Sequence, residues 1–528
     1  MIVLARYKSV QEGFTKLKRT IITTEAAIPN GGEGYFPQDI KRLYNIPNEL
    51  TGEGQTIGIL EFSNGYNLRD AEQFWRMHGI SSPQVTFVSV DGTPNDGGRN
   101  ADDEEATLDL QWAGAIAPGA HIIVYEADGA SFENFAQSVT KTLQYILNDT
   151  QYHPSILSIS YGDAEISFDS AEVHRWGDLI SKLDSKGITV CISSGDQGAY
   201  GLHDPNGPKV RHADGPATAP MAIAVGGTSL QPDGTETAWT FNTSENMGAT
   251  GGGFSSIFAK PDYQNNISNN KRAIPDISCN ADPLYGYQII FQGQKMSVGG
   301  TSVSCPVFAA VIALANQRRT QQGMSPLSSL VKILYSNGIQ STYRDITVGN
   351  NSYNDVIGYD AETGWDACTG FGSFDATKLI EYLSKLEVGQ LPHPELVQEE
   401  NQILPTPPEN DKEVVVRVKA VIQKVESDAH RHGVSHHHLL VDNIQVLKVW
   451  NATQMQINGS TFVAIRYGDS LGLKEPIPDL SEGKTIQLQG RYIPKNNAHP
   501  DIGNPGDPVI DETHNPFGFV IYEGKLYE

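Results

Sequence analysis

Residues 297–317, SVGGTSVSCPVFAAVIALANQ, are the stretch of sequence that decides the fold of this chain. Two glycines, a threonine and a serine lead into an apolar run that carries Pro306 near its start. Within this run, the apolar positions that recur at the spacing of one helical face are Val307, Ala310, Val311 and Leu314. We therefore predict a helix that begins on a glycine-rich bend and has Ser302 in its first turn.

Ser302 has two interpretations. A serine in the first turn of a helix has an exposed hydroxyl next to backbone N–H groups that lack intrahelical partners, and an acyl-transfer nucleophile requires both properties. Serine and threonine are also common at helix N-termini because they satisfy those same N–H groups. The stretch by itself leaves catalysis and helix capping both open.

The composition limits the class of protein. A chain of 528 residues is too long for one ordinary hydrophobic core, so at least two domains are expected. Its 39% hydrophobic residues, with 52 Gly and 29 Pro, indicate a loop-rich globular protein, and no apolar run reaches the length of a membrane span. The formal charge of -24 argues against nucleic acid as a partner, because phosphate would be repelled, and it suits a protein that stays soluble in acid.

The cysteines stand singly in apolar or glycine-rich segments without CxxC spacing, and we interpret them as buried free thiols. They are Cys191, Cys279, Cys305 and Cys368. Residues 1–20, MIVLARYKSVQEGFTKLKRT, have basic residues throughout and lack the continuous apolar core of a secretory signal.

Strands and helices alternate from Gln55 onwards. The predicted strands are TIGILEF, QVTFVSV, HIIVYEA, SILSIS, GITVCISS and MAIAVGG, and the predicted helices span 68–78, 104–115 and 168–186. This alternation predicts an α/β fold with a mainly parallel sheet and helices on both faces. Ligands in such folds gather at the C-terminal ends of the strands.

The composition changes after about residue 386. Residues 387–411, EVGQLPHPELVQEENQILPTPPEND, are acidic and proline-rich without periodicity, which indicates a linker. Beyond them, short alternating strands separated by turn residues are typical of a small closed or nearly closed β-barrel. We expect an N-terminal arm at 1–33, an α/β domain at 34–386, the linker, and an all-β barrel domain at 412–528.

The C-terminal region also carries a histidine cluster, which consists of His430, His432, His436, His437 and His438. Clustered imidazoles can bind Zn²⁺ or Ni²⁺, but no fixed spacing to a cysteine or carboxylate completes a metal site here. We expect these histidines in a solvent-exposed loop between strands.

Two acidic segments are candidates for work with Ser302. Glu105 and Asp109 are four residues apart, so on a helix their carboxyls share one face, and two like charges on a partly buried face raise at least one pKa. A solvated acidic helix start explains the same spacing. Asp196 follows a buried strand at a turn, where a protonated carboxyl could donate to an oxyanion, although Asp beside Gly also simply favours turns.

These stretches together resemble the sedolisin family of serine-carboxyl peptidases over residues 34–386. The motifs occur in order: ExxxDLQ with AxAPGA, SISxG, SSGDxG, TGGGFS, GGTSxSxP, and DITxGNN with GWDxxTGxGS. The resemblance implies a subtilisin-like fold. It also implies a nucleophile, a general base, a carboxylate that supports the base and an oxyanion-hole acid, which by this match are Ser302, Glu105, Asp109 and Asp196.

The resemblance implies further contacts. One Ca²⁺ would be bound by Asp345, Ile346, Glu362, Gly364 and Asp366, and hard oxygen ligands suit that ion. Substrate would contact Gly162, Asp214 and Gly252, with the Asp214 carboxylate favouring a basic side chain near the cleaved bond. In the family, a glutamate on the first core strand and a tryptophan in SISWG extend the catalytic hydrogen-bond network. Glu61 matches the glutamate, and Tyr161 replaces the tryptophan.

We therefore expect an acid-acting serine-carboxyl endopeptidase that cleaves protein or peptide substrates as a monomer, with a bell-shaped pH profile. The resemblance suggests an extracellular protein, and the arm at 1–33 is too short for the prodomain that family members usually carry. The barrel weakly resembles OB-folds. Two alternatives stay open: an inactive homologue that binds through its barrel, and a neutral subtilisin-like protease that uses an unidentified histidine. His78 precedes glycine as in the His-Gly-Thr motif of subtilisins, but the threonine is missing.

Overall fold

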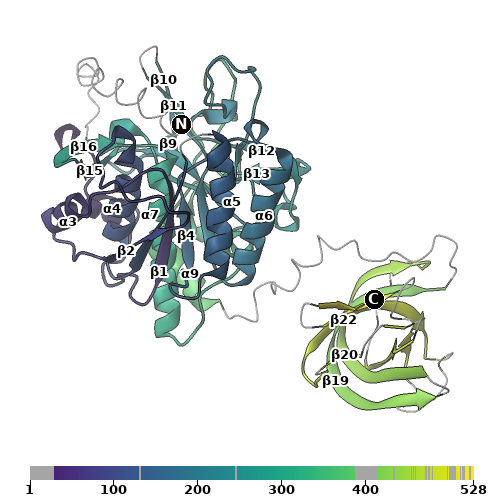
Figure 1. The fold of residues 1–528 in the computed structure, drawn as a ribbon. Coiled ribbons are helices and arrows are strands. Elements are labelled where there is room, and N and C mark those ends of the chain that lie inside the picture. Colours follow the sequence, from purple (N-terminus) through teal and green to yellow (C-terminus); the bar gives the residue numbers. More distant parts are fainter. Residues whose placement is uncertain are drawn as a thin grey trace. The chain divides into compact units, whose positions relative to one another are not determined.

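The computed structural model describes residues 29–129, 132–243, 246–386, 413–431 and 434–452, and from there to 527 with short gaps. By its contacts, the chain divides into two compact units, Met1–Pro392 and His393–Glu528 (Figure 1). Most of the predicted N-terminal arm and the whole predicted linker lie outside the described residues. No described helix combines the length and apolar character that crossing a membrane requires.

A parallel sheet forms the centre of the first unit. The described residues give an eight-stranded sheet in the order β14-β8-β6-β4-β1-β3-β2, with β9 added antiparallel to β8. Its strands are β1 (Thr56–Phe62), β2 (Gln84–Ser89), β3 (His121–Ala127), β4 (Ile156–Ile159), β6 (Thr189–Ser193), β8 (Ile223–Leu230), β9 (Glu236–Ala238) and β14 (Ile277–Asn280). The central strands are buried along almost their whole length, as their near-continuous apolar sequence requires.

Helices pack on both faces of this sheet (Figure 1). They are α2 (Pro37–Leu43), α3 (Leu68–Met77), α4 (Glu104–Ile116), α5 (Phe132–Asn148), α6 (Ser170–Ser185), α7 (Thr301–Gln321), α8 (Leu330–Leu334) and α9 (Ala376–Lys385). The helices α5 and α6 pack together, while α4 and α9 pack against α7. The predicted α/β class and its sheet are therefore confirmed, and so is the prediction that the cysteines are buried and free.

Short strands complete the first unit. They are β5 (Asp163–Ala164), β7 (Asp214–Gly215), β10 (Thr240–Thr243), β11 (Asn246–Ala249), β12 (Gly253–Ala259), β13 (Lys271–Ile274), β15 (Tyr287–Phe291), β16 (Gln294–Val298), β17 (Tyr343–Arg344) and β18 (Ser373–Phe374). All of them form two-stranded antiparallel pairs outside the central sheet. In one of these pairs, β5 with β7, the first strand follows the C-terminal end of β4.

The helix α7 is buried more completely than its sequence pattern predicts. The pattern indicates one apolar face, but every residue from 301 to 317 is buried. The helix contacts β1, β4, β6, β8 and β14 of the sheet and also contacts α4 and α9. Because alanine, serine and glycine dominate its first turns and flanks, neighbouring elements can approach it closely.

The second unit is a closed barrel. Its strands are β19 (Val415–Arg431), β20 (Val434–Trp450), β21 (Thr461–Tyr467), β22 (Thr485–Ile493), β23 (Val509–Asp511), β24 (Phe519–Tyr522) and β25 (Lys525–Tyr527). The ring closes through β19, β20, β21, β23 and β22, because β22 pairs again with β19. Inward-facing side chains such as Val418, Val441 and Leu488 form its core.

Two sequence-based predictions for this region are wrong. The first two strands are long rather than short, with 17 residues each. The second concerns the histidines: His436, His437 and His438 lie on β20 rather than in an exposed loop, and the latter two are 7% exposed. Both strands continue through the polar segment because they pair with each other along nearly their whole length, and His437 also bonds Asp428 at 2.9 Å. His432 lies outside the described residues.

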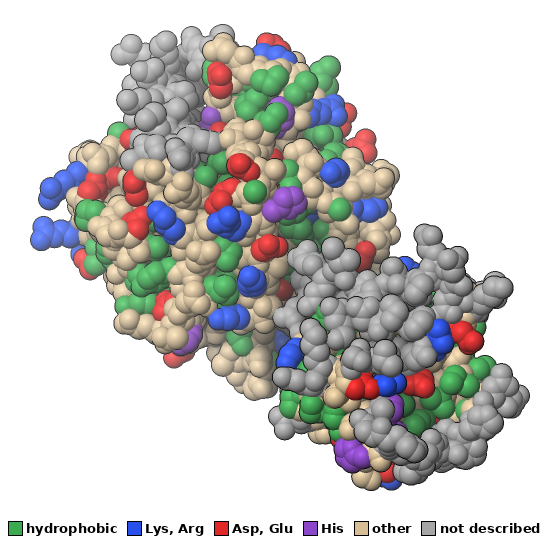
Figure 2. Space-filling view, turned by 45° about the vertical axis from the view of Figure 1, so that its right-hand side comes forward, with side chains coloured by type: hydrophobic (Ala, Val, Ile, Leu, Met, Phe, Trp, Pro, Cys, Tyr) green, Lys and Arg blue, Asp and Glu red, His purple; other side chains and the backbone are tan. Residues whose placement is uncertain are grey.

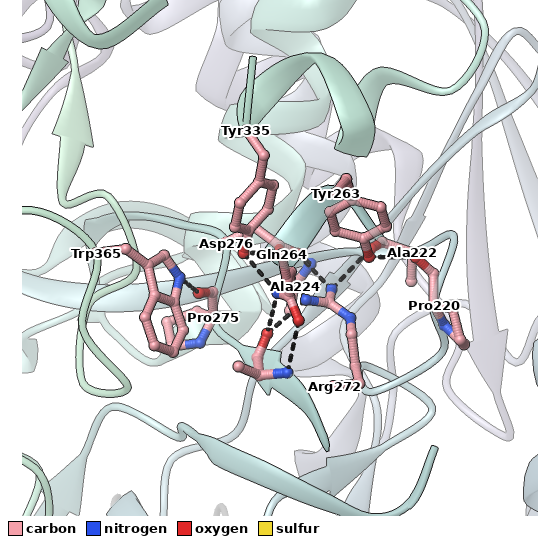
Figure 3. Close-up of polar contacts among 11 residues, drawn as sticks. Pro220, Ala222, Ala224, Tyr263, Gln264, Arg272, Pro275, Asp276, Tyr335 and Trp365 are labelled. Atoms are coloured by element: carbon pink, nitrogen blue, oxygen red, sulfur yellow. Dashed lines mark hydrogen bonds and ion pairs between the residues drawn. The ribbon is translucent and has the colours of Figure 1, made fainter. Parts of the chain in front are cut away.

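A buried ion pair joins three elements of the first unit (Figure 3). Arg272 on β13 donates to both carboxylate oxygens of Asp276, at 2.8 and 2.7 Å, and both side chains are fully buried. Asp276 also accepts from the backbone N–H of Ala224 on β8 and from the hydroxyl of Tyr335, each at 2.7 Å. Four donors on one carboxylate satisfy its charge in the interior, which is the condition for a buried ion pair to persist.

We expect Arg272→Met to lower the free energy of unfolding of the first unit by about 3–5 kcal/mol, because it leaves the Asp276 carboxylate buried without its cation. Urea unfolding of the full chain measures this. The control is Arg318→Met, which breaks an exposed pair with Glu49 and should cost about 1 kcal/mol or less. Equal losses in the two variants would contradict this role of the buried pair.

Candidate active site

The first turn of α7 carries Ser302 at the C-terminal edge of the parallel sheet. The helix begins after Gly300, which has a φ of 108° and whose N–H donates to the carbonyl of Ala281 at 2.7 Å. A side chain at position 300 would be strained in this conformation and would lie 2.8 Å from a carboxylate oxygen of Asp196. The glycine-rich bend predicted from the sequence therefore exists because Asp196 approaches the backbone there.

Two carboxyls of α4 lie one helical turn apart in the interior. Glu105 is 1% exposed and Asp109 is fully buried, on a helix that packs directly against α7. Both carboxyls also affect the thiol of Cys305, which lies on α7 one turn after Ser302. Burial, and then the charges of Asp109 and Glu105, raise the pKa of that thiol to about 12.

Ser160, which follows β4, links the two helices. Its hydroxyl lies 2.7 and 2.9 Å from the carboxylate oxygens of Asp109 and 3.0 Å from the backbone carbonyl of Ser302. Pro306 leaves that carbonyl available, because a proline has no N–H to close the usual helical bond to the residue four positions earlier. The Ser302 hydroxyl in turn is 3.4 Å from the carbonyl of Ser160. Pro306, one turn further along α7, therefore frees the backbone carbonyl of Ser302 itself to accept from Ser160.

A second layer of polar groups surrounds these carboxyls. Glu61 on β1 accepts a hydrogen bond from the hydroxyl of Tyr161, which lies 2.6 Å from the side-chain amide of Asn64. Tyr161, although it replaces a tryptophan of the family motif, thus still contacts Glu61. Burial and the charge of Asp109 raise the pKa of Glu61 well above its usual range.

The electrostatics of this interior favour protonated acids. Burial and the nearby Glu105 raise the pKa of Asp109 well above its usual range, and Ser160 only partly offsets them. Acidic and basic side chains mix on the outer surface of the first unit (Figure 2), whereas Asp109 and Glu61 lie where water does not screen them. Buried acids with raised pKa values can take up or release a proton close to the pH at which a protein works.

Asp196 contacts the N-terminus of α7. It follows β6, and one of its carboxylate oxygens accepts from the N–H and the hydroxyl of Thr301 at 2.9 and 2.8 Å. The backbone of this turn is fixed by bonds from Ala249 and Gly251 to the carbonyls of Asp196 and Gly195. Thr301 binds one carboxylate oxygen, and the other lies on the side facing Gly300.

Comparisons with known proteins identify relatives of this chain. A model of the subtilase family matches residues 90–371. Kumamolisin from Bacillus sp. (strain MN-32) is 36% identical in an alignment of 365 residues that covers 66% of this chain and 63% of that protein. Physarolisin from Physarum polycephalum is 30% identical in an alignment of 409 residues that covers 67% of this chain and 70% of that protein.

This chain belongs to the subtilase family, among the sedolisins. The solved structure of Pseudomonas sedolisin, a serine-carboxyl proteinase, superimposes with a TM-score of 0.60 and 28% identity, and covers 67% of this chain and 98% of that one. The fold expected from the sequence is thereby confirmed. The chain spans 63% of the length of kumamolisin and 61% of sedolisin from Pseudomonas sp. (strain 101).

In this sedolisin-family chain, the residues predicted to contact substrate belong to two segments. Gly162 precedes β5, and a side chain there would meet the carbonyl of Gly215 at 2.8 Å on the paired strand β7. On β7, Asp214 is only 2% exposed, and its carboxylate lies against Gly195. Gly252 precedes β12, and a side chain there would meet the carbonyl of Ala367 at 2.3 Å.

The predicted calcium ligands lie around one loop. The N–H of Gly364 donates to Asp345 at 2.9 Å, and the N–H of Glu362 donates to Asp366 at 2.9 Å, so both carboxylates border residues 362–366. Burial raises the pKa of Asp366 to about 6. Within the described residues, no three His, Cys, Asp or Glu side chains gather to hold a metal, so backbone carbonyls would have to supply the other ligands. Such an all-oxygen donor set fits Ca²⁺.

Two polar side chains that contact the predicted residues have no role in the sequence-based prediction. Ser160 and Thr301 were not assigned roles, although a serine at the end of a core strand and a threonine beside the predicted nucleophile were available signals. His78 lies at the end of α3, packs between Phe36 and Phe74, and bonds Gln288 at 2.9 Å. Aromatic packing and this hydrogen bond account for the His78 side chain.

We expect the first unit to lose stability as the pH rises from about 4 to about 9. The folded-state pKa values of Asp103, about 7, and Glu126, about 9, exceed those of the unfolded chain, about 4, mainly because of burial. Protonated forms therefore favour folding, and this stabilisation is full below about pH 4 and is lost through the two raised values.

Urea unfolding of the Ser302→Ala variant at a series of pH values would measure this without self-cleavage. The midpoint should fall steadily over that range. A midpoint that rises between pH 5 and pH 8, the usual optimum of folded proteins, would contradict the expectation.

Proposed function

We propose that this protein is an acid-acting serine-carboxyl endopeptidase that cleaves protein or peptide substrates as a monomer. The observation that carries the proposal is the contact of Ser160 with both Asp109 and the backbone of Ser302, which joins the carboxyls of α4 to the first turn of α7. Membership of the sedolisins makes hydrolysis of peptide bonds the reaction that this arrangement best supports.

In the proposed reaction, the Ser302 hydroxyl attacks the carbonyl carbon of the peptide bond while Glu105 takes its proton. Asp109 supports Glu105 through its position one turn further along α4. The tetrahedral intermediate collapses when Glu105 passes that proton to the leaving amine, which leaves an acyl ester on Ser302. Water then attacks the carbonyl carbon of the ester while Glu105 takes a proton from it. Glu105 passes this proton to the Ser302 oxygen as the ester bond breaks, which releases the acid product.

The developing oxyanion needs donors that are already in place. The backbone N–H of Ser302 lies in the first turn of α7, where helical geometry leaves it without an intrahelical acceptor. Asp196, if protonated on the oxygen that Thr301 does not bind, supplies the second donor. The mechanism thus requires Glu105 ionised and Asp196 neutral at once, which restricts activity to acid and produces a bell-shaped profile.

A neutral mechanism with a histidine base is the rival for this fold. His78 bonds Gln288 and packs against aromatic rings, so it does not offer that base. An inactive homologue is the other alternative, and it is the outcome that an activity measurement distinguishes.

We expect Glu105→Gln to lower kcat on a denatured protein substrate by at least about 10³-fold at every pH, because an amide cannot accept the serine proton. Proteolysis assays between about pH 3 and pH 8 measure it. The Ser302→Ala variant gives the background, and Glu72→Gln on the exposed face of α3 is the matched control. Near-normal turnover by the Glu105 variant would refute the serine-carboxyl mechanism, and a wild type without turnover would leave the inactive homologue.

We further propose that Asp214, Gly162 and Gly252 contact substrate and that the Asp214 carboxylate favours a basic side chain near the cleaved bond. The support is position: Gly162 and Asp214 lie on the paired strands β5 and β7, and Asp214 lies against Gly195, the residue before Asp196. A preference of this kind weakens as the carboxylate is protonated in strong acid.

One Ca²⁺ is also proposed, held by the carboxylates of Asp345 and Asp366 and by backbone oxygens of Ile346, Glu362 and Gly364. Bound there, the ion would neutralise carboxylates and fix the 362–366 loop. The loop continues to Ala367, whose carbonyl lies against Gly252. The proposed ion would therefore fix a loop whose end lies against Gly252, one of the proposed substrate contacts.

We expect chelation to lower the melting temperature of the first unit, because a metal that binds only the folded state stabilises it, by about 2.7 kcal/mol at a hundredfold excess over Kd. Calorimetry of the Ser302→Ala chain with and without chelator measures the shift. Asp345→Asn should abolish the shift and calcium binding, whereas Asp360→Asn, an exposed neighbour in sequence, should retain both. A shift that persists in the Asp345 variant would place the ion elsewhere.

A further inference from the structure

Glu126 is an acid inside an apolar strand. It lies on β3, where it pairs in register with Glu61 of β1, so the two side chains emerge on the same face of adjacent parallel strands. Glu126 is 1% exposed and Glu61 is fully buried. Two buried acids at neighbouring positions cannot both be ionised without a large electrostatic cost. The proposed catalytic mechanism does not use Glu126.

A turn connects these two acids to each other by a second route. The N–H of Asn64 donates to one carboxyl oxygen of Glu126 at 3.0 Å, while the Asn64 side chain lies 2.6 Å from the Tyr161 hydroxyl. Tyr161 donates to Glu61. The turn starts at Ser63, which has a φ of 61°, a conformation that a non-glycine residue adopts only when its surroundings hold it.

The surroundings of Glu126 keep its proton in place. Burial raises its pKa to about 9, the backbone of Asn64 and Ser63 partly offsets this, and the charges of Asp103 and Asp96 add to it. Glu61 and Tyr66 are the other titratable groups that interact with it. These titratable neighbours of Glu126 are all acids or phenols. The second carboxyl oxygen of Glu126 makes no hydrogen bond within the described structure, which is far less costly for a neutral acid than for an anion.

We propose that Glu126, in its protonated form, is a positioning residue for the catalytic carboxyls. It holds the backbone of Asn64, and Asn64 and Tyr161 hold Glu61 next to Asp109. This assignment rests on the proposed function, since it gives Glu126 a part in placing Glu105 and Asp109. Glu126 acts through a chain of contacts that fixes the positions of the catalytic carboxyls. This chain requires a neutral hydrogen-bond acceptor at residue 126 rather than a charged group.

The first experiment compares Glu126→Leu with Glu126→Gln in assays of kcat and KM. Leucine removes the acceptor for Asn64, so kcat should fall between about tenfold and a hundredfold while KM stays within about twofold, because no substrate contact is lost. Glutamine keeps a neutral acceptor oxygen and should rescue most of that loss. The control is Glu381→Gln, an exposed carboxyl on α9. Wild-type kcat in the leucine variant, or failure of glutamine to rescue it, would overturn the proposal.

A double variant tests whether Glu126 acts through Tyr161. Tyr161→Phe removes the hydroxyl that links Asn64 to Glu61, so its effect on kcat and that of Glu126→Leu should not add when the two are combined. Independent, additive losses would mean that Glu126 acts by another route and would overturn the chain of contacts.

The second experiment does not depend on peptidase activity. In the Ser302→Ala background, Glu126→Gln should make the first unit more stable than its parent at pH 8 and equal to it near pH 4, because glutamine mimics the protonated acid. A variant that is less stable at pH 8 would mean that Glu126 is ionised and would overturn the inference, even if folding prevents study of the leucine variant. Failure of the proposed function, by contrast, would appear as an active Glu105→Gln enzyme.

Discussion

Burial of residues 301–317 of α7 is the constraint on which the rest of the first unit depends. The helix contacts five strands of the parallel sheet and also α4 and α9, so its position is fixed from every side. A rigid helix places its first turn reliably, and the first turn carries Ser302. Pro306 then frees the carbonyl of Ser302 for Ser160, which connects the packing of α7 to the carboxyl of Asp109. The first turn of α7 is therefore both fixed by packing and the place of the proposed nucleophile.

The first unit stabilises buried acids in two different ways. Asp276 is paired with the cation of Arg272 and also accepts from Tyr335 and a backbone N–H. Glu61, Asp109 and Glu126 have no such cation among the groups that shift them, and burial raises their pKa values instead. Raised pKa values favour the protonated forms of these three acids in the folded state, which matches the acid conditions that the proposed mechanism requires.

The site lies where several backbone segments approach one another closely. Gly300 lies against Asp196, Gly195 lies against Asp214, and Gly252 lies against Ala367. In each case a side chain would displace the neighbouring group, and the first two positions also have positive φ values. The glycines therefore allow the C-terminal ends of the strands, the start of α7 and the proposed calcium loop to converge. Function in such a fold depends on these close approaches as much as on the acids themselves.

The sequence by itself determined the α/β class, the central strands and the helices 104–116 and 301–321 to within a few residues, because periodicity and glycine punctuation are local signals. Motif order pointed to Ser302, Glu105, Asp109 and Asp196, and their roles stay a proposal. Only the tertiary structure decided that residues 301–317 of α7 are buried on every face, that Ser160 joins two helices and that His437 is buried on β20. The reason is physical: the hydrogen bonds of Ser160 and His437 reach partners between 40 and 142 residues away in the sequence, which no local pattern records.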